Sequence, residues 1–206
     1  MQKIRFNDTL QPSQGRCPGM NEPMKTPRTT TPEELERVHR ALKKKFNDKK
    51  LIFGSGLVGA KVVFVGEMLN SDGEKEAKPL AGQSEKLFHQ VLKTVGLDKK
   101  KIYVTNLVKY YPNGKVPTPK ELKAHAAFLK EELKSLNPSL VVTLGNLALN
   151  GVGLRQPLDN VHGRTFNFGS YELVPTFHPS YATKDPTVKD KIEKDLARLK
   201  EILKKS

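Results

Sequence analysis

The sequence predicts an α/β fold, a three-layer α/β/α sandwich with a central, mainly parallel sheet of four to five strands. Three observations predict it. Short runs rich in β-branched residues alternate with longer segments of helical periodicity, which is the pattern of right-handed β-α-β units. Two capping boxes mark the beginnings of helices. The length of 206 residues suits one domain with a substantial core.

The first thirty residues differ in composition from the rest of the chain. Residues 1–30 mix Gln, Asn, Pro, Gly, Arg and Lys without a sustained period, so we expect an irregular, basic N-terminal arm. The remaining residues, 31–206, are expected to form a single domain.

Two helices of this domain begin at capping boxes of the same form. At residues 31–34 and 118–121 a threonine N-cap is followed by a proline and, three residues after the cap, by a glutamate. The first helix is expected to run to about residue 47 and the second to residue 136. The positions that we expect them to bury are Leu35, Val38, Leu42 and Phe46 in the first, and Leu122, Ala126, Leu129, Leu133 and Leu136 in the second.

Short runs of β-branched residues predict the strands. They occupy residues 51–53, 62–65, 102–108 and 140–144. Helices at residues 84–95 and 118–136 separate the last three runs, which gives β-α-β-α-β and therefore a parallel arrangement. A hairpin is expected over residues 165–174, and a helix from about residue 187 closes the domain.

The chain is strongly basic, with a formal net charge of +14. Such a charge is typical either of a protein that binds nucleic acid or of a lysine-rich surface that keeps a protein soluble, and the charge alone does not separate the two. No apolar run approaches the length of a membrane span, and no secretory leader is recognisable. We therefore expect an intracellular, cytoplasmic protein that does not bind membranes.

Cysteine and histidine usage argues against a bound metal. Cys17 is the one cysteine, which excludes an intramolecular disulfide and an all-cysteine metal or iron-sulfur site. The five histidines contain no i, i+4 pair of the kind that binds zinc. The glycines of residues 54–59 precede a strand instead of opening a helix, so they indicate a turn and not a dinucleotide site. We expect no metal and no cofactor.

Two segments of the chain carry most of the functional information. Residues 61–67 and 175–181 each lead from a buried strand into a polar turn. Because the carboxyl ends of parallel strands meet at one edge of a sheet, Glu67 and His178 are expected to lie near each other there. That edge is where an α/β protein usually places its chemistry.

Five segments resemble, in order and spacing, the uracil-DNA glycosylase superfamily. They are residues 62–67, 79–82, 104–109, 144–145 and 177–181, with the sequences VVFVGE, PLAG, VTNLVK, LG and FHPSY. The match runs from about Thr31 to the C-terminus, and its closest branch looks like family four, the thermostable iron-sulfur enzymes. The resemblance implies the same α/β fold and a DNA glycosylase activity.

The chain also departs from that branch. Its first motif begins with Gly66 and Glu67 but lacks the Pro-Gly that follows in family four, and Gly73 stands where the first residue of an acidic pair would be. Leu80 occupies the position of a phenylalanine that stacks on uracil. The four cluster cysteines are missing; Tyr110 stands at one of their positions, with His39 and His125 near two others. The resemblance therefore implies a relative without the cluster, and the family name does not fix its base preference.

Removal of a base from duplex DNA places requirements on the site. The nucleotide must be flipped into a pocket, and basic groups must hold the surrounding phosphates. As the N-glycosidic bond breaks, the sugar gains cationic character and the leaving pyrimidine gains negative charge. The useful groups are a donor at the base oxygen, an amide at the pairing edge, and a carboxylate near the sugar and the attacking water.

Three residues match these requirements. Asn106 offers a donor and an acceptor that match O4 and N3–H of uracil, although a strand-end asparagine also commonly bonds nearby backbone. His178 is expected to donate to O2 of the leaving base, aimed by the backbone restriction that Pro179 imposes; an isolated His-Pro is otherwise a turn. Glu67 is expected to orient water or to stabilise the sugar cation, or else to cap the turn that follows it.

The resemblance implies further contacts. Gly66, Met68 and Leu80 join Asn106 in binding the base. The expected DNA contacts are Gln83, Ser84, Lys109, Arg164, Ser180, Tyr181 and Lys184. Ser84 is also expected to be the N-cap of its helix. Residues 182–184 are expected on a loop that enters the minor groove, where the family usually has a wedge side chain and where Ala182 is a poor one.

We therefore expect a monomeric hydrolase, a monofunctional DNA repair glycosylase that removes a deaminated base from DNA, with uracil as the expected base. Two alternatives stay open. The altered first motif would reshape the pocket for another base, such as hypoxanthine or a modified pyrimidine. The chain would otherwise be a catalytically weak DNA-binding module that keeps the fold and the groove.

Overall fold

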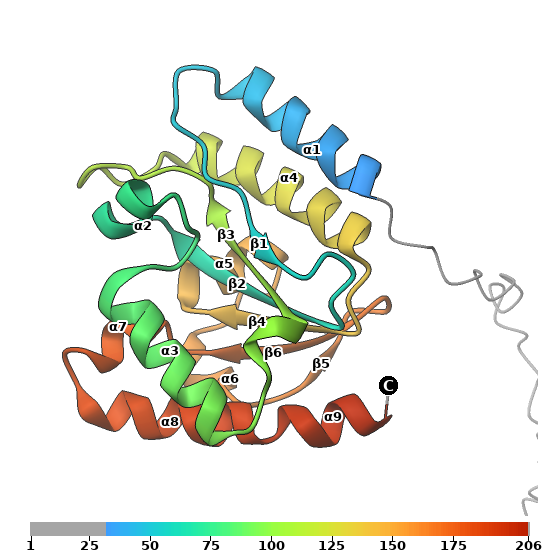
Figure 1. Ribbon diagram of the computed structural model, residues 1–206, viewed down its shortest axis with the longest axis vertical. Helices are drawn as coiled ribbons and strands as arrows, with labels where there is room; N and C mark the ends of the chain where they lie inside the picture. Colours follow the sequence, from blue (N-terminus) through green and yellow to red (C-terminus); the bar gives the residue numbers. More distant parts are fainter. Residues whose placement is uncertain (1–31, 206) are drawn as a thin grey trace, which may run out of the picture.

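The computed structural model describes residues 32–205, so the expected N-terminal arm at residues 1–30 lies outside the described residues. A single sheet forms the middle layer (Figure 1). Its strand order is β1-β3-β2-β4-β6-β5. The strands are β1 (Ser55–Gly56), β2 (Val62–Met68), β3 (Ile102–Val108), β4 (Leu140–Leu144), β5 (Phe166–Asn167) and β6 (Glu172–Thr176).

The four central strands are parallel, and the two outer ones are antiparallel to their neighbours. Every residue of β4 and the first five of β2 are buried, as expected for parallel strands between two helical layers. The predicted mainly parallel sheet is confirmed. Two edge strands of two residues each raise its strand number to six.

Helices cover both faces of the sheet and complete the predicted three layers (Figure 1). One layer contains α1 (Pro32–Lys45), α4 (Pro119–Leu136), α5 (Asn146–Val152) and α6 (Leu158–Val161). The other contains α3 (Gly82–Thr94), α8 (Pro186–Ala197) and α9 (Leu199–Lys205). The short helices α2 (Ser71–Glu76) and α7 (Pro179–Ala182) follow the ends of β2 and β6, and the 3₁₀ helix η1 (Lys99–Lys101) precedes β3.

Alternating side chains of β2 separate two hydrophobic cores. Val63 and Val65 pack into the core under α1 and α4, whereas Val62 and Phe64 pack into the core under α3 and α8. This alternation follows from the period of two in a strand, and it requires an apolar residue at each position because both faces are covered.

The strand predicted at residues 51–53 is not formed. The Ile52 N–H donates to the Lys109 carbonyl oxygen (2.7 Å), and the Phe53 ring stacks on His39 at 4.1 Å between ring centroids. One main-chain hydrogen bond and the packing of Phe53 therefore hold this segment in place. The edge strand β1 lies instead within the glycine-rich turn that follows.

Helix beginnings agree with the sequence in one case and differ in another. In α4 the Thr118 Oγ1 accepts from the Glu121 N–H (3.2 Å) and the Glu121 carboxylate accepts from the Thr118 N–H (2.8 Å), so the predicted capping box is confirmed. In α3 the N-cap is Ala81, and Ser84 is buried in the first turn. The prediction of Ser84 as N-cap is therefore wrong, because the chain turns inward at the buried Leu80 and the N-cap lies three residues earlier.

The remaining elements follow the sequence closely. The predicted hairpin is formed by β5 and β6, and the C-terminal helix is divided at Arg198 into α8 and α9. Between residues 32 and 205, no helix has the length and apolar character needed to cross a membrane.

Candidate active site

The carboxyl ends of the parallel strands form one edge of the sheet. Gly66 near the end of β2 is the register partner of Asn106 in β3. At the end of β4, the Gly145 N–H donates to the carbonyl oxygen of the last residue of β6 (2.8 Å). Glu67 is the last residue but one of β2, next to Gly66. His178 follows the end of β6 after one intervening residue. The structure thus brings together, on one edge, the groups that the sequence placed there.

Asn106 is fixed at this edge by two other segments. Its Nδ2 donates to the Pro79 carbonyl oxygen (2.6 Å), and only 2% of the residue is exposed. A Cβ at Gly66 would lie 2.1 Å from Asn106 Oδ1, so the amide requires a glycine beside it. The Pro79 contact uses one of the two Nδ2 hydrogens, so the amide has a second donor and Oδ1 with which to meet a base.

The Glu67 carboxylate lies at the beginning of α5. Its Oε1 accepts from the Leu147 N–H (2.8 Å), and Gly145, with φ of 99°, leaves space for it, since a Cβ there would be 2.4 Å from Oε1. Burial raises the pKa of Glu67, and the backbone N–H groups of Leu147 and Asn146 oppose this rise. Glu67 therefore does cap a helix, but the helix is α5 and not the turn that follows Glu67.

His178 is held as a neutral ring. Its Nδ1 accepts from the Ser180 N–H (3.2 Å) and lies 2.8 Å from Ser180 Oγ. Because a backbone N–H can only donate, Nδ1 carries no proton, and the ring proton must be on Nε2. Burial lowers the pKa of His178 to about 4. At neutral pH the ring therefore offers an uncharged Nε2–H donor.

The segment after His178 differs in part from the expectation. Tyr181 is exposed, and the negative charge of Glu67 raises the pKa of its phenol. Lys184 is exposed, as a phosphate contact requires. Ala182 lies within α7 and is buried in the core under α3 and α8, so it is not on a loop that could enter a groove.

The altered first motif forms a separate small helix, α2. The Asn70 side chain accepts from the Gly73 N–H (2.7 Å) and caps it. Gly73 is buried, and a Cβ there would lie 2.8 Å from a Leu69 methyl carbon and 2.9 Å from the Lys78 carbonyl oxygen. An acidic side chain does not fit at Gly73 in this packing, which is the physical reason for the departure from the family pattern.

Met68 and Leu80 pack on different cores. The Met68 side chain packs against the core under α1 and α4, whereas the Leu80 side chain belongs to the core under α3 and α8. The contact of Met68 with the base stays a prediction.

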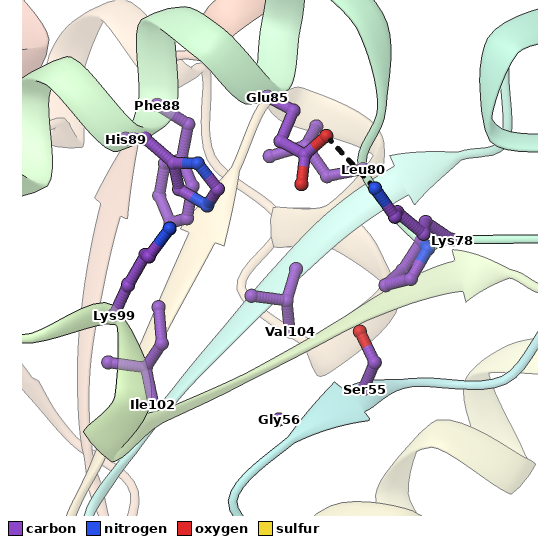
Figure 2. Close-up of a pocket in the computed structure, with 11 residues that line it drawn as sticks. Ser55, Gly56, Lys78, Leu80, Glu85, Phe88, His89, Lys99, Ile102 and Val104 are labelled. Atoms are coloured by element: carbon purple, nitrogen blue, oxygen red, sulfur yellow. Dashed lines mark ion pairs between the residues drawn. The ribbon is translucent and has the colours of Figure 1, made fainter. Parts of the chain in front are cut away.

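Leu80 also lines a hollow between α3 and β1, with a cavity volume of about 130 Å³ (Figure 2). Val104 and Phe88 contribute apolar surface, and an ion pair of Lys78 with Glu85 (3.6 Å) lies beside it. The hollow is smaller than the ~300 to 1,000 Å³ of ordinary ligand pockets. Its position gives the Leu80 side chain free space on the side of the edge strand. Near it, Gln83 in the first turn of α3 is exposed.

The structure contradicts the predicted role of Lys109 as a phosphate contact. Its ammonium group forms an ion pair with Glu132 of α4 and donates to Thr105, and the side chain is buried. A phosphate cannot reach an ammonium group that is enclosed and already paired. Lys109 is therefore a structural cation that joins β3 to α4.

Arg164 lies beside the end of β6. The preceding residue, Gly163, donates its N–H to the Pro175 carbonyl oxygen (2.8 Å) and accepts from Arg198 (2.9 Å). Arg164 lines a surface hollow there with Arg198 and Glu201. Its contact with phosphates stays a prediction.

The positions of the family-four cluster hold packed rings. His125 stacks on Phe46 at 4.2 Å and lies 5.6 Å from the Tyr110 ring, while His39 stacks on Phe53. Burial lowers the pKa of His125 to about 4, and neither of its ring nitrogens has a hydrogen-bond partner. Among residues 32–205, no group of His, Cys, Asp and Glu side chains is arranged to hold a metal ion. These residues do not fit an iron-sulfur cluster, which requires thiolates.

The parallel sheet between two helical layers, with polar side chains gathered at its carboxyl edge, is the architecture of an α/β enzyme. A family model described as the uracil DNA glycosylase superfamily matches residues 53–200. The chain belongs to this superfamily, whose members are hydrolytic glycosylases.

The similar proteins include several from one branch. The chain is 29% identical to the type-4 uracil-DNA glycosylase of Thermotoga maritima over 188 residues, which cover 85% of this chain and 98% of that protein. It is 28% identical to the type-4 uracil-DNA glycosylase of Saccharolobus solfataricus, with 83% and 84% covered. A DNA polymerase of Bacillus phage SP01 is 29% identical over 78% of this chain but only 17% of its own length. The resemblance to family four is confirmed.

Sequence reasoning missed the main-chain groups that hold the site. The Pro79 carbonyl, the Leu147 N–H and the Ser180 N–H each fix one functional side chain. One signal was present, because Gly145 directly follows a strand rich in β-branched residues and so marks a close approach at its end.

Proposed function

We propose that the protein hydrolyses the N-glycosidic bond of a deaminated base, principally uracil, after rotation of its nucleotide out of DNA. The observation that carries this proposal is the buried Asn106 amide held by the Pro79 carbonyl. The exposed residues Gln83, Tyr181 and Lys184 and the half-buried Ser180 supply DNA contacts around it. All these residues come from one chain, so a monomer suffices.

The fixed amide explains how uracil is told from cytosine. Uracil presents an acceptor at O4 and a donor at N3, which match an Nδ2–H and Oδ1 of Asn106. Cytosine presents the reverse order, with an amino donor at position 4 and an acceptor at N3. An asparagine free to turn by 180° would bind both bases. Turning here would replace the Nδ2–H donor facing the Pro79 carbonyl by Oδ1, so the amide orientation favours uracil.

His178 and Glu67 then act on the bond itself. The C1′–N1 bond breaks with its electron pair passing to the base, and negative charge develops on O2. The neutral Nε2–H of His178 donates to this oxygen, an interaction that strengthens as the charge grows. Water attacks C1′ and loses a proton, and the Glu67 carboxylate orients this water and stabilises the positive charge of the sugar. The departing base finally takes up a proton.

A second candidate substrate is hypoxanthine. Its O6 and N1–H present the same acceptor and donor as uracil, so Asn106 cannot separate the two bases and the size of the pocket must do so. Leu80 replaces a flat phenylalanine, and the 130 Å³ hollow beside it gives the leucine room to move. This observation favours a site that adapts to a larger base.

Single-turnover release of free base tests the proposal. Wild-type protein is mixed in excess with duplexes that contain uracil, hypoxanthine or a mismatch, and binding to intact duplex is measured in parallel. We expect fast release of uracil. His178→Ala should reduce the rate by about 10² to 10³ without a matching loss of binding, since one oxyanion donor is lost.

The outcomes separate the three readings. Release of hypoxanthine at a rate near that of uracil would support the adaptable pocket. Wild-type protein that binds DNA tightly but releases no base would identify a binding module and end the enzymatic proposal. His39→Ala is a matched control, because His39 stacks on Phe53 under α1 and does not lie at the strand ends.

A further inference from the structure

Rotation of a nucleotide out of a duplex leaves a gap in the base stack, and proteins that unstack DNA commonly insert an apolar side chain there. The segment around α7 supplies no purely apolar side chain. Ala182 is buried, Thr183 and Lys184 are polar, and the exposed Tyr181 ends in a hydroxyl group. An apolar side chain that fills the gap in the base stack must therefore come from elsewhere on the same edge.

Val116 is such a group. It is 86% exposed, more than any other large hydrophobic residue of the described part of the chain. A single exposed hydrophobic residue is common on protein surfaces, so its position and the way the chain presents it carry the argument. The residue lies between β3 and α4, in residues 111–118.

The segment presents Val116 on a defined turn. The Lys115 N–H donates to the Pro112 carbonyl oxygen (3.0 Å), across Asn113 and Gly114, whose φ values are 50° and 76°. The next residue, Pro117, is buried and restricts the backbone of Val116. A valine side chain is stiff at χ1, so little freedom is lost when it is held between bases.

Both ends of the segment are anchored. The Tyr110 hydroxyl donates to the Glu121 carboxylate (3.1 Å), and the capping box of α4 holds Thr118 to the same glutamate. The turn therefore projects from a fixed base.

Its place in the fold matches the task. β3 contains Asn106 and runs toward the edge where Glu67 and His178 lie, and the turn continues from its end. Figure 1 shows the segment between β3 and α4 extending from the same end of the sheet as α2 and α7. Three exposed lysines accompany Val116 and could neutralise phosphates beside an inserted side chain: Lys115, Lys120 and Lys123.

We propose that Val116 enters the DNA base stack when the nucleotide is rotated out, with Lys115 on an adjacent phosphate. The inference rests on the proposed function. It assigns to this chain a wedge on the turn after β3 instead of on the segment after His178.

The experiment compares Val116→Ala with Val58→Ala. Val58 is also exposed, at 40%, but precedes β2 and so lies at the opposite end of that strand from Glu67. Uracil release is measured in single turnover from duplex and from single-stranded oligonucleotides. Val116→Ala should slow release from duplex by about tenfold, because the unstacking cost is less well offset, and leave single-stranded release unchanged. Val116→Leu, which keeps an apolar side chain, should release uracil from duplex at the wild-type rate. Val58→Ala should change neither the duplex rate nor the single-stranded rate.

A second readout does not need catalysis. A duplex with 2-aminopurine beside the uracil becomes more fluorescent when the stack is opened. Wild-type protein should raise this signal and Val116→Ala should not, with Val58→Ala as the control. This distinguishes the two proposals: wild type that opens the stack but releases no base would end the proposed enzymatic function and leave the wedge in place.

Three outcomes would overturn the wedge. One is an unchanged duplex rate and fluorescence signal in Val116→Ala. Another is a loss of single-stranded release equal to the duplex loss, which would place the valine in the base pocket. The third is a wild-type protein that binds the duplex but leaves its fluorescence unaltered, which would show that no side chain opens the base stack.

Discussion

At the scale of single residues, main-chain groups set the chemistry of the site. The proton of His178 is placed on Nε2 by the Ser180 amide, and the Asn106 amide is oriented by the Pro79 carbonyl. Side-chain identity alone determines neither property. A substitution at Ser180 therefore leaves the histidine tautomer intact, whereas a change in the path of residues 79–81 would alter base recognition.

The Asn106 amide gives the first prediction. Asn106→Asp removes the Nδ2–H donors and places a carboxylate against the Pro79 carbonyl and against O4 of uracil. Single-turnover uracil release should fall by orders of magnitude, while binding to undamaged duplex, set mainly by phosphates, should change little. Asn160→Asp makes the same chemical change at an exposed position and should have no effect. Uracil release at the wild-type rate in Asn106→Asp would remove this residue from base recognition.

His125 gives a prediction on acid stability. In the folded protein its pKa is about 4, below the ordinary 6.5, so the unfolded chain binds this proton more readily. Stability is therefore complete above about pH 6.5 and is lost as the pH falls toward 4.

His125→Phe should keep the stack on Phe46, remove two unpartnered nitrogens and flatten this part of the pH dependence. The gain at neutral pH should be about 1 to 3 kcal/mol, the usual cost of an unsatisfied buried polar group. The free energy of unfolding at several pH values between 4 and 7 is the measurement. A pH dependence identical to that of wild type would show that His125 does not titrate as its burial requires.

At the scale of elements, the sequence predicted what local patterns encode. The capping box of α4, the apolar face of α1 and the strands β2, β3 and β4 follow from spacing and residue type. The short strand β1 and the break between α8 and α9 do not, since they depend on packing partners remote in the chain. Of the site, the sequence placed Glu67, Asn106 and His178 at one edge.

Lys109 shows why a DNA contact predicted from the sequence can be wrong. After a strand of apolar residues, a lysine looks like the start of a solvent-exposed loop. Its partner Glu132 stands on the apolar face of α4, between Leu129 and Leu136, and a charge there indicates a buried partner. The same signal appears at Asp195 on α8, which accepts from Thr176 Oγ1 (2.7 Å). Sequence alone shows that such a charge needs a partner, but not which residue provides it.

The buried ion pair of Lys109 with Glu132 gives a prediction on stability. Lys109→Met leaves the Glu132 carboxylate buried with no cation, and it should lower the free energy of unfolding by about 3 to 5 kcal/mol. The double variant Lys109→Met/Glu132→Leu should recover most of this loss, since buried pairs are often replaceable by apolar residues.

The exposed pair Lys134–Glu131 (3.9 Å) is the matched control, and Lys134→Met should cost less than about 1 kcal/mol. Chemical denaturation of the four proteins measures these differences. A double variant as unstable as the single one would show that the two charges do not act as a pair.

At the scale of the whole molecule, charge and shape act together. The net charge of +14 is spread over lysines on many elements, so total charge sets general affinity for DNA and the position of each cation sets its share. Lys184 lies just beyond α7, whereas the exposed Lys134 lies near the end of α4, which leads to the start of β4 and so to the opposite edge of the sheet.

DNA affinity should therefore fall linearly on a plot of log affinity against log salt. Lys184→Glu should reduce the slope by about one phosphate contact, while Lys134→Glu makes the same charge change and should leave the slope near that of wild type. Binding titrations at several salt concentrations give both slopes. Equal reductions would mean that the DNA covers more of the surface than the strand-end edge.

The stacked rings between α1, α4 and the segment before β1 have a consequence for the life of the protein in a cell. Imidazole and phenyl groups join these elements, and the chain has one cysteine, far too few for a cluster at this place. Assembly of the junction therefore needs no iron delivery and no sulfur donor. Peroxide or a chelator leaves these contacts chemically intact, so a cell starved of iron can fold this protein as readily as one that is well supplied.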